Sequence, residues 1–354
     1  MKIGILSMQN VINYGSYLQS YALKSVLEAL GYDVFFVRIR PGKQIVHSSS
    51  ITTGNSAKID KYILKRIEHV IFSRKRRNSF EKDLFHRIGI NDPINEAECD
   101  MIVIGSDEVF NCIQASSWGF TTQLFGDTAV PALSYAASCG YTTFERVEEL
   151  GLSNDLSSAL KKLKAISVRD SNTFEFVKRL VGSESMQHLD PVLIYDWKKE
   201  VLPQTKFKNY ILIYAYDNRI NNETEIKAIK SFAKKYNKQL ISFGLYQRWC
   251  DKNIMCTPFE LLSYFDSADY VITDTFHGTV ISIKRNKQFA TIVRDSNSNK
   301  LCDLLSRFDL EERQVSSITS LEDIITKAID YDPINILLEA EKERSIEYLH
   351  SNLV

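Results

Sequence analysis

The sequence predicts an α/β protein with two Rossmann-like domains. Short runs of aliphatic and β-branched residues alternate with segments whose apolar side chains recur at i, i+3 and i+4, which is typical of parallel strands covered by helices. The alternation occurs twice, and Pro203 and charged residues interrupt it over 198–207. The 354 residues also exceed what one hydrophobic core usually serves. We therefore expect domains over residues 1–203 and 204–330 that face each other across a cleft, and a C-terminal helix within 331–354 that packs back on the body.

The first domain opens with a predicted β-α-β unit. A strand over 2–7 precedes a helix over 17–30, which ends at Gly31, and a second strand follows over 34–37. The loop before the helix carries Asn13 and Gly15. Glycine lets a ligand approach the backbone closely, but this loop matches neither the G-x-G-x-x-G nor the P-loop fingerprint. The pattern therefore disfavours nucleotide binding of those two types.

More strands follow in the first domain, and two of them end in polar residues. We expect strands over 101–104, 133–136, 165–168 and around 188–194, with a helix over 172–181. The first of these strands ends in Gly105-Ser106-Asp107-Glu108, and the third ends in Arg169-Asp170. Ligands of open parallel sheets bind outside the carboxyl ends of the strands, so these residues are candidates for a site. Gly-Ser-Asp is also ordinary turn and helix-capping chemistry.

The second domain shows the same alternation. We expect strands over 211–215, 239–243, 270–273 and 289–293, and helices over 225–236, 257–266 and, at the C-terminus, 334–349. Thr257, Pro258 and Glu260 supply an N-cap, an N1 proline and a capping-box glutamate.

The run from Tyr270 to Gly278 is the most informative stretch. An apolar strand gives way to Asp274-Thr275-Phe276-His277-Gly278, and a helix-compatible segment follows. A helix N-terminus at the carboxyl end of a strand offers free N–H groups to an anion. A histidine there can exchange protons near neutral pH. The alternative is that His277 only caps a turn.

Composition limits the class of protein. The chain is 44% hydrophobic and 25% charged with a net charge of zero, so no global field attracts nucleic acid. Six cysteines lack any C-x-x-C pair or metal-ligand spacing, which predicts neither a zinc site nor a disulfide framework. We find no signal peptide and no apolar run long enough to span a bilayer. The expected location is the cytoplasm.

The ordered set of these motifs resembles one family. Asn13-Tyr14-Gly15, Gly105-Ser106-Asp107-Glu108-Val109-Phe110-Asn111, Ser167-Val168-Arg169-Asp170, Asp190-Pro191, the stretch 268–278 and residues 299–305 occur in the order seen in polysaccharide pyruvyl transferases. The resemblance extends from the first strand to about Leu310. It implies a GT-B-like fold and an enzyme that uses phosphoenolpyruvate, with no further cofactor, to place a pyruvate ketal on two sugar hydroxyls of a polysaccharide, such as an exopolysaccharide, or of a glycan precursor.

The resemblance also implies roles for individual residues. His277 matches the family's histidine before glycine, and Arg169 matches its strand-end arginine; both are assigned as catalytic. His277 would transfer protons and Arg169 would bind an anionic group of the donor, although a salt bridge of Arg169 with Asp170 or Glu175 is an alternative. Further residues are assigned to donor or anion binding: Asn13, Gly15, Ser106, Asp107, Gly278 and Lys300. No metal ligand is assigned.

One position departs from the family pattern. Thr275 stands where many members have arginine, two residues before the histidine, and this removes one expected anion contact. Arg285, Arg294 or Lys300 are candidates to replace it. Two alternative functions stay open: a GT-B glycosyltransferase that uses a nucleotide sugar, and a non-catalytic glycan-binding descendant of the enzyme, for which Thr275 is the argument.

Residues 58–87 form a basic insertion in the first domain, with ten Lys or Arg against four Asp or Glu. One interpretation is an interfacial helix that reaches a lipid-linked acceptor at the inner face of an anionic membrane. The other is a helix packed on the first domain with a solvated basic face. The expected partners are thus phosphoenolpyruvate, a sugar or lipid-linked glycan acceptor and, as a hypothesis, the membrane surface.

Overall fold

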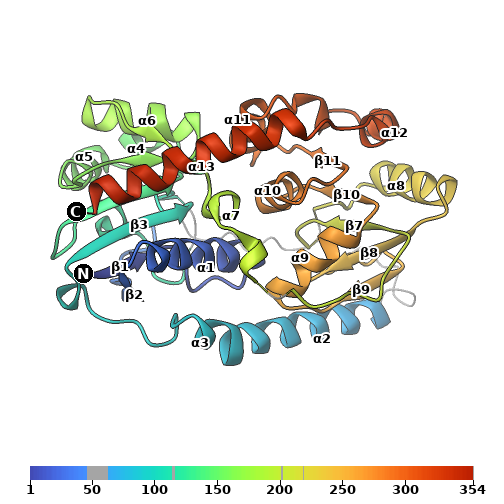
Figure 1. The fold of residues 1–354 in the computed structure, drawn as a ribbon, viewed down its shortest axis with the longest axis horizontal. Coiled ribbons are helices and arrows are strands. Elements are labelled where there is room, and N and C mark those ends of the chain that lie inside the picture. The colour runs from blue at the N-terminus through green and yellow to red at the C-terminus, as the bar shows by residue number, and fades with distance from the viewer. Residues whose placement is uncertain (46–62, 114–115, 201, 218, 354) are drawn as a thin grey trace. The chain divides into compact units, whose positions relative to one another are not determined.

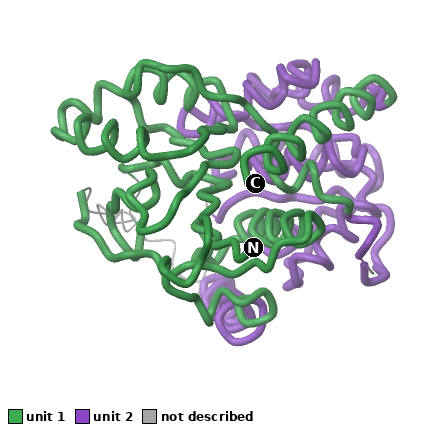
Figure 2. Tube along the Cα trace, turned by 60° about the vertical axis from the view of Figure 1, so that its left-hand side comes forward, with its two compact units in different colours: residues 1–48, 85–196, 332–354 green, residues 49–84, 197–331 purple. Residues whose placement is uncertain are grey.

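The computed structural model describes residues 1–45, 63–113, 116–200, 202–217 and 219–353 (Figure 1). The chain forms two compact units, green and purple in Figure 2. Unit 1 comprises residues 1–48, 85–196 and 332–354, and unit 2 comprises residues 49–84 and 197–331. Three separate stretches of chain therefore build unit 1.

Unit 1 contains a six-stranded parallel sheet in the order β2-β1-β3-β4-β5-β6. The strands are β1 (Lys2–Leu6), β2 (Asp33–Phe36), β3 (Met101–Asp107), β4 (Ala132–Ala137), β5 (Ser167–Val168) and β6 (Met186–Gln187). In the register, Ile5 lies opposite Phe36 on one side and Val103 on the other. All residues of β4 are buried, as expected for a strand in a parallel sheet covered on both faces.

The helices of unit 1 include the C-terminal one. They are α1 (Tyr14–Ala29), α3 (Phe85–Arg87), α4 (Phe144–Glu149), α5 (Ser153–Leu160), α6 (Ser171–Val181), α7 (Pro191–Ile194) and α13 (Asp332–Asn352). The hydroxyl of Tyr348 in α13 donates a hydrogen bond to the backbone oxygen of Ser134 at 2.9 Å, and its ring lies 4.5 Å from that of His188. The expected C-terminal helix is thus confirmed, and it packs on unit 1.

Unit 2 contains the second six-stranded parallel sheet, in the order β12-β11-β10-β7-β8-β9. Its strands are β7 (Tyr210–Tyr214), β8 (Gln239–Phe243), β9 (Lys252–Ile254), β10 (Tyr270–Thr273), β11 (Phe289–Ile292) and β12 (Gln314–Val315). Val271, in the central strand β10, pairs with Leu212 and Phe289. Two parallel sheets, one in each unit, confirm the predicted α/β class.

Helices alternate with these strands along the chain of unit 2. They are α2 (Ile63–Ser79), α8 (Glu223–Lys235), α9 (Pro258–Ser267), α10 (Phe276–Lys284), α11 (Ser298–Arg307) and α12 (Leu321–Thr326). The predicted capping box of α9 is present, since the Thr257 N–H donates to the Glu260 carboxylate at 2.7 Å and the Glu260 N–H donates to the Thr257 hydroxyl at 3.2 Å. Among the described residues, no helix has the length and apolarity needed to cross a bilayer.

One predicted strand is wrong. The segment around 188–194 was expected to be a strand, but the strand β6 ends at Gln187 and Pro191 begins the helix α7. The Asp190 carboxylate accepts the Val192 N–H at 3.0 Å, and Pro191 occupies the first helical turn. An aspartate followed by proline is a helix start, and here this local chemistry prevails over the apolar run that follows.

The basic insertion differs from expectation in the unit that it joins. Residues 58–62 lie outside the described residues, and the helix α2 that follows belongs to unit 2 rather than to the first domain. His69 of α2 lies 3.0 Å from the Asp217 carboxylate, and the ring of Phe72 packs on Tyr246. These partners are distant in the sequence, so no local pattern indicates this attachment.

Candidate active site

The first turn of α1 is capped by its own side chains. The Asn13 side-chain oxygen accepts hydrogen bonds from the N–H groups of Gly15, at 2.7 Å, and Ser16, at 3.3 Å. Asn13 is therefore the N-cap of α1. Two N–H groups that an anion could have used are already satisfied, so the structure gives Asn13 and Gly15 a capping role.

The backbone is unusual where β3 and β4 end. Gly105 has φ +132°, and a Cβ there would lie 2.1 Å from the backbone oxygen of Tyr135, so only glycine fits. Asp107 (φ +76°) and Ala136 (φ +45°) also occupy the left-handed region. Such conformations cost about 1–3 kcal/mol each for non-glycine residues and concentrate at functional sites. The tips of two neighbouring strands are thus a candidate for functional chemistry.

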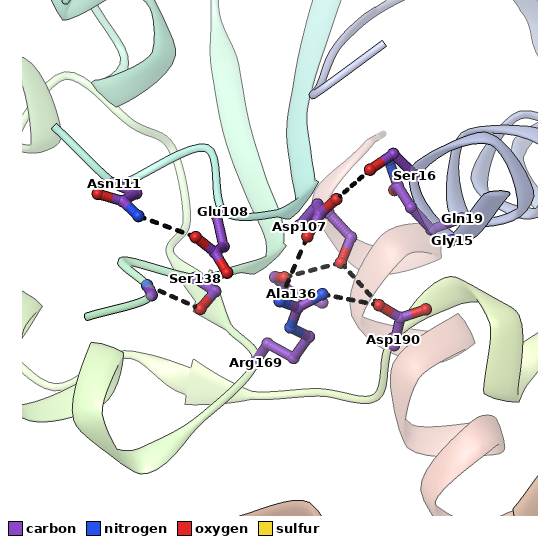
Figure 3. Close-up of polar contacts among 12 residues, drawn as sticks. Gly15, Ser16, Gln19, Asp107, Glu108, Asn111, Ala136, Ser138, Arg169 and Asp190 are labelled. Atoms are coloured by element: carbon purple, nitrogen blue, oxygen red, sulfur yellow. Dashed lines mark hydrogen bonds and ion pairs between the residues drawn. The ribbon is translucent and has the colours of Figure 1, made fainter. Parts of the chain in front are cut away.

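Arg169, which follows β5, lies between two carboxylates (Figure 3). Its guanidinium donates to Asp190 at 2.9 Å and lies 3.5 Å from Asp107, and its side chain is only 3% exposed. Asp107 also accepts a hydrogen bond from the Ser16 hydroxyl at 2.7 Å. Burial lowers the pKa of Arg169, but the charges of Asp107 and Asp190 outweigh it and raise the pKa above its ordinary value.

Further polar contacts beside this network involve the ends of β3 and β4 and the start of α6. Ser106 is fully buried and donates to the backbone oxygen of Ala136 at 2.9 Å. Asp170 caps α6 and accepts the Ser138 hydroxyl at 2.6 Å. The alternative to donor binding was a salt bridge, and the ion pairs of Arg169 at 2.9 and 3.5 Å are with Asp190 and Asp107. Because two carboxylates surround this one guanidinium, its contacts hold the strand ends together.

A small pocket lies beside this network in unit 1. It is lined by residues from the end of β3 and the loop beyond it, among them Glu108, Asn111, Trp118, Phe120 and Thr121. The Asn111 amide donates to the Glu108 carboxylate at 2.8 Å, which fixes both groups (Figure 3). Aromatic rings beside a carboxylate and an amide offer an apolar surface together with hydrogen-bonding groups. The free space is about that of one water molecule, too small for a sugar ring.

In unit 2, a cluster of hydroxyls holds the junction of β10 and α10. The Thr275 side chain caps α10 by accepting the Gly278 N–H at 2.9 Å, and the Thr273 hydroxyl donates to the backbone oxygen of Tyr214 at 2.6 Å. A Cβ on Gly278 would lie 2.0 Å from the Thr273 hydroxyl oxygen. Gly278 is therefore required for close packing, and the 2% exposed Thr275 caps the helix with a hydroxyl that an arginine at this position would lack.

Asp274 is the buried carboxyl of this junction. Its side chain is fully buried; Oδ1 accepts the Tyr216 N–H at 3.3 Å, and Oδ2 has no hydrogen-bond partner within the described part of the chain. Burial raises the pKa of Asp274 to about 6, while the charges of Arg219 and Arg294 act to lower it. Asp274 stands in the strand-end motif, but only its burial in the fold marks it as a candidate.

His277 and Lys300 lie at the same end of α10. His277 belongs to the first turn of the helix and is 7% exposed. The Lys300 ammonium of α11 lies 6.0 Å from the centre of the neighbouring Phe276 ring. Lys300 is thus near Phe276, the residue before His277 in the first turn of α10.

The other candidate cations differ in their ion pairs and in their distance from the first turn of α10. Arg285 forms an ion pair with Asp266 and follows the last residue of α10, which is roughly 13 Å of helix from its first turn. Arg294 makes a bidentate pair with Glu225 at 2.7 and 2.9 Å. Arg219, which the motifs do not single out, is close enough to Asp274 to affect its pKa. By position, Arg219 beside Asp274 and Lys300 near Phe276 are the candidates to contact an anion at this junction.

A family model described as polysaccharide pyruvyl transferase matches residues 13–296. The chain belongs to the polysaccharide pyruvyl transferase family. The match includes Asn13, Arg169 and His277, and Lys300 lies beyond its end. This confirms the resemblance inferred from the ordered motifs, and membership of this family implies a transferase.

Solved structures resemble this pyruvyl transferase family member over nearly its whole length. The glycosyltransferase SsfS6 of Streptomyces sp. SF2575, complexed with thymidine diphosphate, is 12% identical, with a TM-score of 0.45 and 98% of each chain covered. MnaA of S. aureus, in a co-structure with UDP, is 11% identical, with a TM-score of 0.46 and 97% of this chain and 96% of that chain covered. No curated protein matches the chain significantly. Both TM-scores are below 0.5, so the fold rests on the two sheets themselves.

Proposed function

We propose that the protein transfers the pyruvyl group of phosphoenolpyruvate to two hydroxyls of a sugar acceptor, with a ketal and inorganic phosphate as products. One observation carries this proposal beyond family membership. Unit 2 carries His277 and the buried carboxyl of Asp274, whose pKa is about 6, at the junction of β10 and α10, with Arg219 close to Asp274 and Lys300 6.0 Å from the Phe276 ring. Phosphoenolpyruvate is a small, strongly anionic molecule, and each step of its conversion to a ketal is accompanied by a proton transfer.

The reaction requires protons to move in both directions. A proton adds to the methylene carbon of the enol, and an acceptor hydroxyl oxygen bonds to the adjacent carbon and loses its own proton. The bond from that carbon to the phosphate oxygen then breaks, and the second hydroxyl attacks and loses its proton. Two protons leave the hydroxyls; one is balanced by the proton taken up in the new methyl group, and the other goes to the released phosphate. A positioned acid or base typically contributes about 10²–10⁴-fold to such a step.

We assign proton transfer to His277 and Asp274 and donor binding to Lys300 and Arg219. A carboxyl with a pKa of about 6 is partly protonated near neutral pH, so Asp274 can act as an acid as well as a base. Arg169 was expected to bind the donor, but its two carboxylate partners support a positioning role for it instead.

The family implies a polysaccharide or its precursor as the acceptor of the pyruvyl group. All six cysteines are free thiols, which supports the proposed cytoplasmic location.

Phosphate release tests the proposed reaction. We expect release that requires both phosphoenolpyruvate and a sugar acceptor, together with a product whose mass includes the pyruvate ketal. If the protein released a nucleoside diphosphate from a nucleotide sugar and no phosphate from phosphoenolpyruvate, the result would instead support a glycosyltransferase. Protection by oligosaccharide alone, without turnover of either donor, would support a non-catalytic glycan-binding protein.

Thermal protection tests the donor site. A ligand at 100 times its Kd stabilises the folded state by about 2.7 kcal/mol, so phosphoenolpyruvate should raise the melting temperature of the native protein. Lys300→Ala should reduce this protection. Lys227→Ala removes the same charge from the exposed face of α8 in the same unit, and it should leave the protection unchanged.

A further inference from the structure

The helix α2 packs on unit 2 through one face. His69 and Arg76 both contact the Asp217 carboxylate, at 3.0 and 3.4 Å. The Tyr246 hydroxyl donates to Glu68 at 3.0 Å, and Phe72 is buried against the Tyr246 ring. Residues 69, 72 and 76 recur every three or four positions, which is one face of an α-helix. This attachment fixes which residues of α2 point outward.

The opposite face of α2 is apolar and exposed. Ile67, Val70 and Ile71 are 51%, 64% and 49% exposed, and they also follow the three- and four-residue spacing of one helix face. Among the residues that the structure describes, large exposed hydrophobic side chains are few, and these three form a continuous stripe on a single helix. A contiguous exposed apolar surface of this kind marks an interaction site.

Cations border this stripe. Arg66 and Arg77 lie on one side of it by helical position, Lys75 lies on the other, and Arg74 continues it toward the C-terminus. All four are exposed, and within the described ranges none of them makes an ion pair. Elsewhere on α2 Arg76 is paired with Asp217, so the helix separates a paired cation on its packed face from unpaired cations on its outer face.

We propose that this outer face of α2 binds the surface of an anionic lipid bilayer. An interfacial helix inserts an aliphatic stripe at the boundary of headgroups and acyl chains and places Lys and Arg against the negative headgroups. The outer face of α2 has both features in that arrangement. The proposal does not rest on the reaction proposed above, because α2 contributes no residue to either candidate site.

Other occupants fit this face less well. The phosphates of a nucleic acid would pair with Arg66, Arg74, Lys75 and Arg77 but would leave Ile67, Val70 and Ile71 without partners. A second copy of the chain would present the same cations to these four, and like charges brought together repel each other. A bilayer with acidic headgroups satisfies both the aliphatic side chains and the charges.

Vesicle flotation with the full-length protein tests the proposal. We expect binding to phosphatidylcholine vesicles that contain about one-third phosphatidylglycerol, none to pure phosphatidylcholine, and weaker binding as salt rises from about 0.05 to about 0.5 M. Each Lys or Arg near an anionic surface strengthens binding roughly fivefold, so the triple variant Arg74→Gln, Lys75→Gln, Arg77→Gln should lose about 100-fold in partition coefficient. The double variant Val70→Ser, Ile71→Ser should also bind more weakly, at every salt concentration.

A matched control distinguishes an effect of this helix face from an effect of the total charge of the protein. The triple variant Lys227→Gln, Lys230→Gln, Lys234→Gln removes the same charge from the exposed side of α8 in the same unit and should bind vesicles like the native protein. Melting temperatures of all variants should match the native value, because the packed face of α2 is untouched. Equal loss in the α8 variant, or native binding by both α2 variants, would overturn the proposal.

The same variants identify a competing occupant. If the native protein ignored anionic vesicles at low salt but shifted duplex DNA, and only the charge variant of α2 lost that shift, the face would be a polyanion site and the proposal would fail. Self-association in sedimentation velocity that disappears in the Val70→Ser, Ile71→Ser variant, without vesicle binding by the native protein, would likewise show that the occupant is a second copy.

Discussion

The burial of Arg169 makes its removal a test of stability. Arg169→Met keeps the length of the side chain but leaves the carboxylates of Asp107 and Asp190 without their cation. The three side chains are 3%, 14% and 1% exposed, so little water reaches the unpaired charges. Breaking a buried ion pair by removing one partner costs about 3–5 kcal/mol. At roughly 2–4 °C per kcal/mol for a unit of this size, the melting temperature should fall by roughly 6–20 °C.

Urea denaturation followed by circular dichroism measures this loss directly. The midpoint should fall in Arg169→Met, with an unchanged slope of free energy against urea concentration. Asp190→Asn is a suitable partner variant, because asparagine keeps the cap on α7 and removes the charge. The double variant should be more stable than the two single losses predict, by about 1–3 kcal/mol, because the two charges compensate each other.

One result would refute this reasoning. If the free energy of unfolding of Arg169→Met lay within about 1 kcal/mol of the native value, the stability of the buried network would not depend on its cation. If that variant also lost affinity for phosphoenolpyruvate alone, the donor-binding role implied by the family resemblance would be correct. The positioning role proposed for Arg169 would then be wrong.

Three further predictions concern unit 2. His277→Ala should lower the turnover number by about 10²–10⁴-fold with little change in protection by phosphoenolpyruvate, and native turnover would contradict a role in proton transfer. The pKa of Asp274 lies at about 6 in the folded state against 3.8 as its ordinary value, so the free energy of unfolding should fall by about 3 kcal/mol as pH rises between these values. Asparagine does not titrate, so the stability of Asp274→Asn should not fall over this pH range and should rise relative to the native protein in melting curves measured at several pH values. Parallel pH dependence of the two proteins would show that Asp274 is not buried as described. Gly278→Ala should destabilise by about 1–3 kcal/mol because its Cβ would meet the Thr273 hydroxyl, and Thr273→Ala should restore part of the loss in the same urea assay.

The alternation of strands and helices was predictable because each element carries its own pattern. The apolar run of Tyr270–Thr273 and the capping box at Thr257 depend only on near neighbours, and both appear in the structure where the sequence places them. The strands β5, β6 and β12 have two residues each, too few to show any period. At Asp190 and Pro191, a local helix start reversed the prediction made from the apolar run.

The chemistry of the site was less predictable because it depends on distant contacts. Arg169 looked like a free strand-end cation, and its burial follows from partners at positions 107 and 190. Asp274 acquires its raised pKa from burial by elements that include Tyr216, 58 residues away. The exposed stripe on α2 became visible only when the packed face was known. In each case the residue type was apparent from the sequence, and its environment was not.

The last helix has a consequence for how the protein is made. Leu349 and Tyr348 of α13 are buried in unit 1, but they follow residues 197–331 of unit 2 in the chain. At roughly 5–20 residues per second, a ribosome needs on the order of ten seconds to add that stretch. During this interval α13 has not yet been synthesised, so the surface around Tyr135 and His188 that it packs against stays uncovered. The nascent first unit is therefore a predicted client for chaperones, and its folding finishes last although its synthesis begins first.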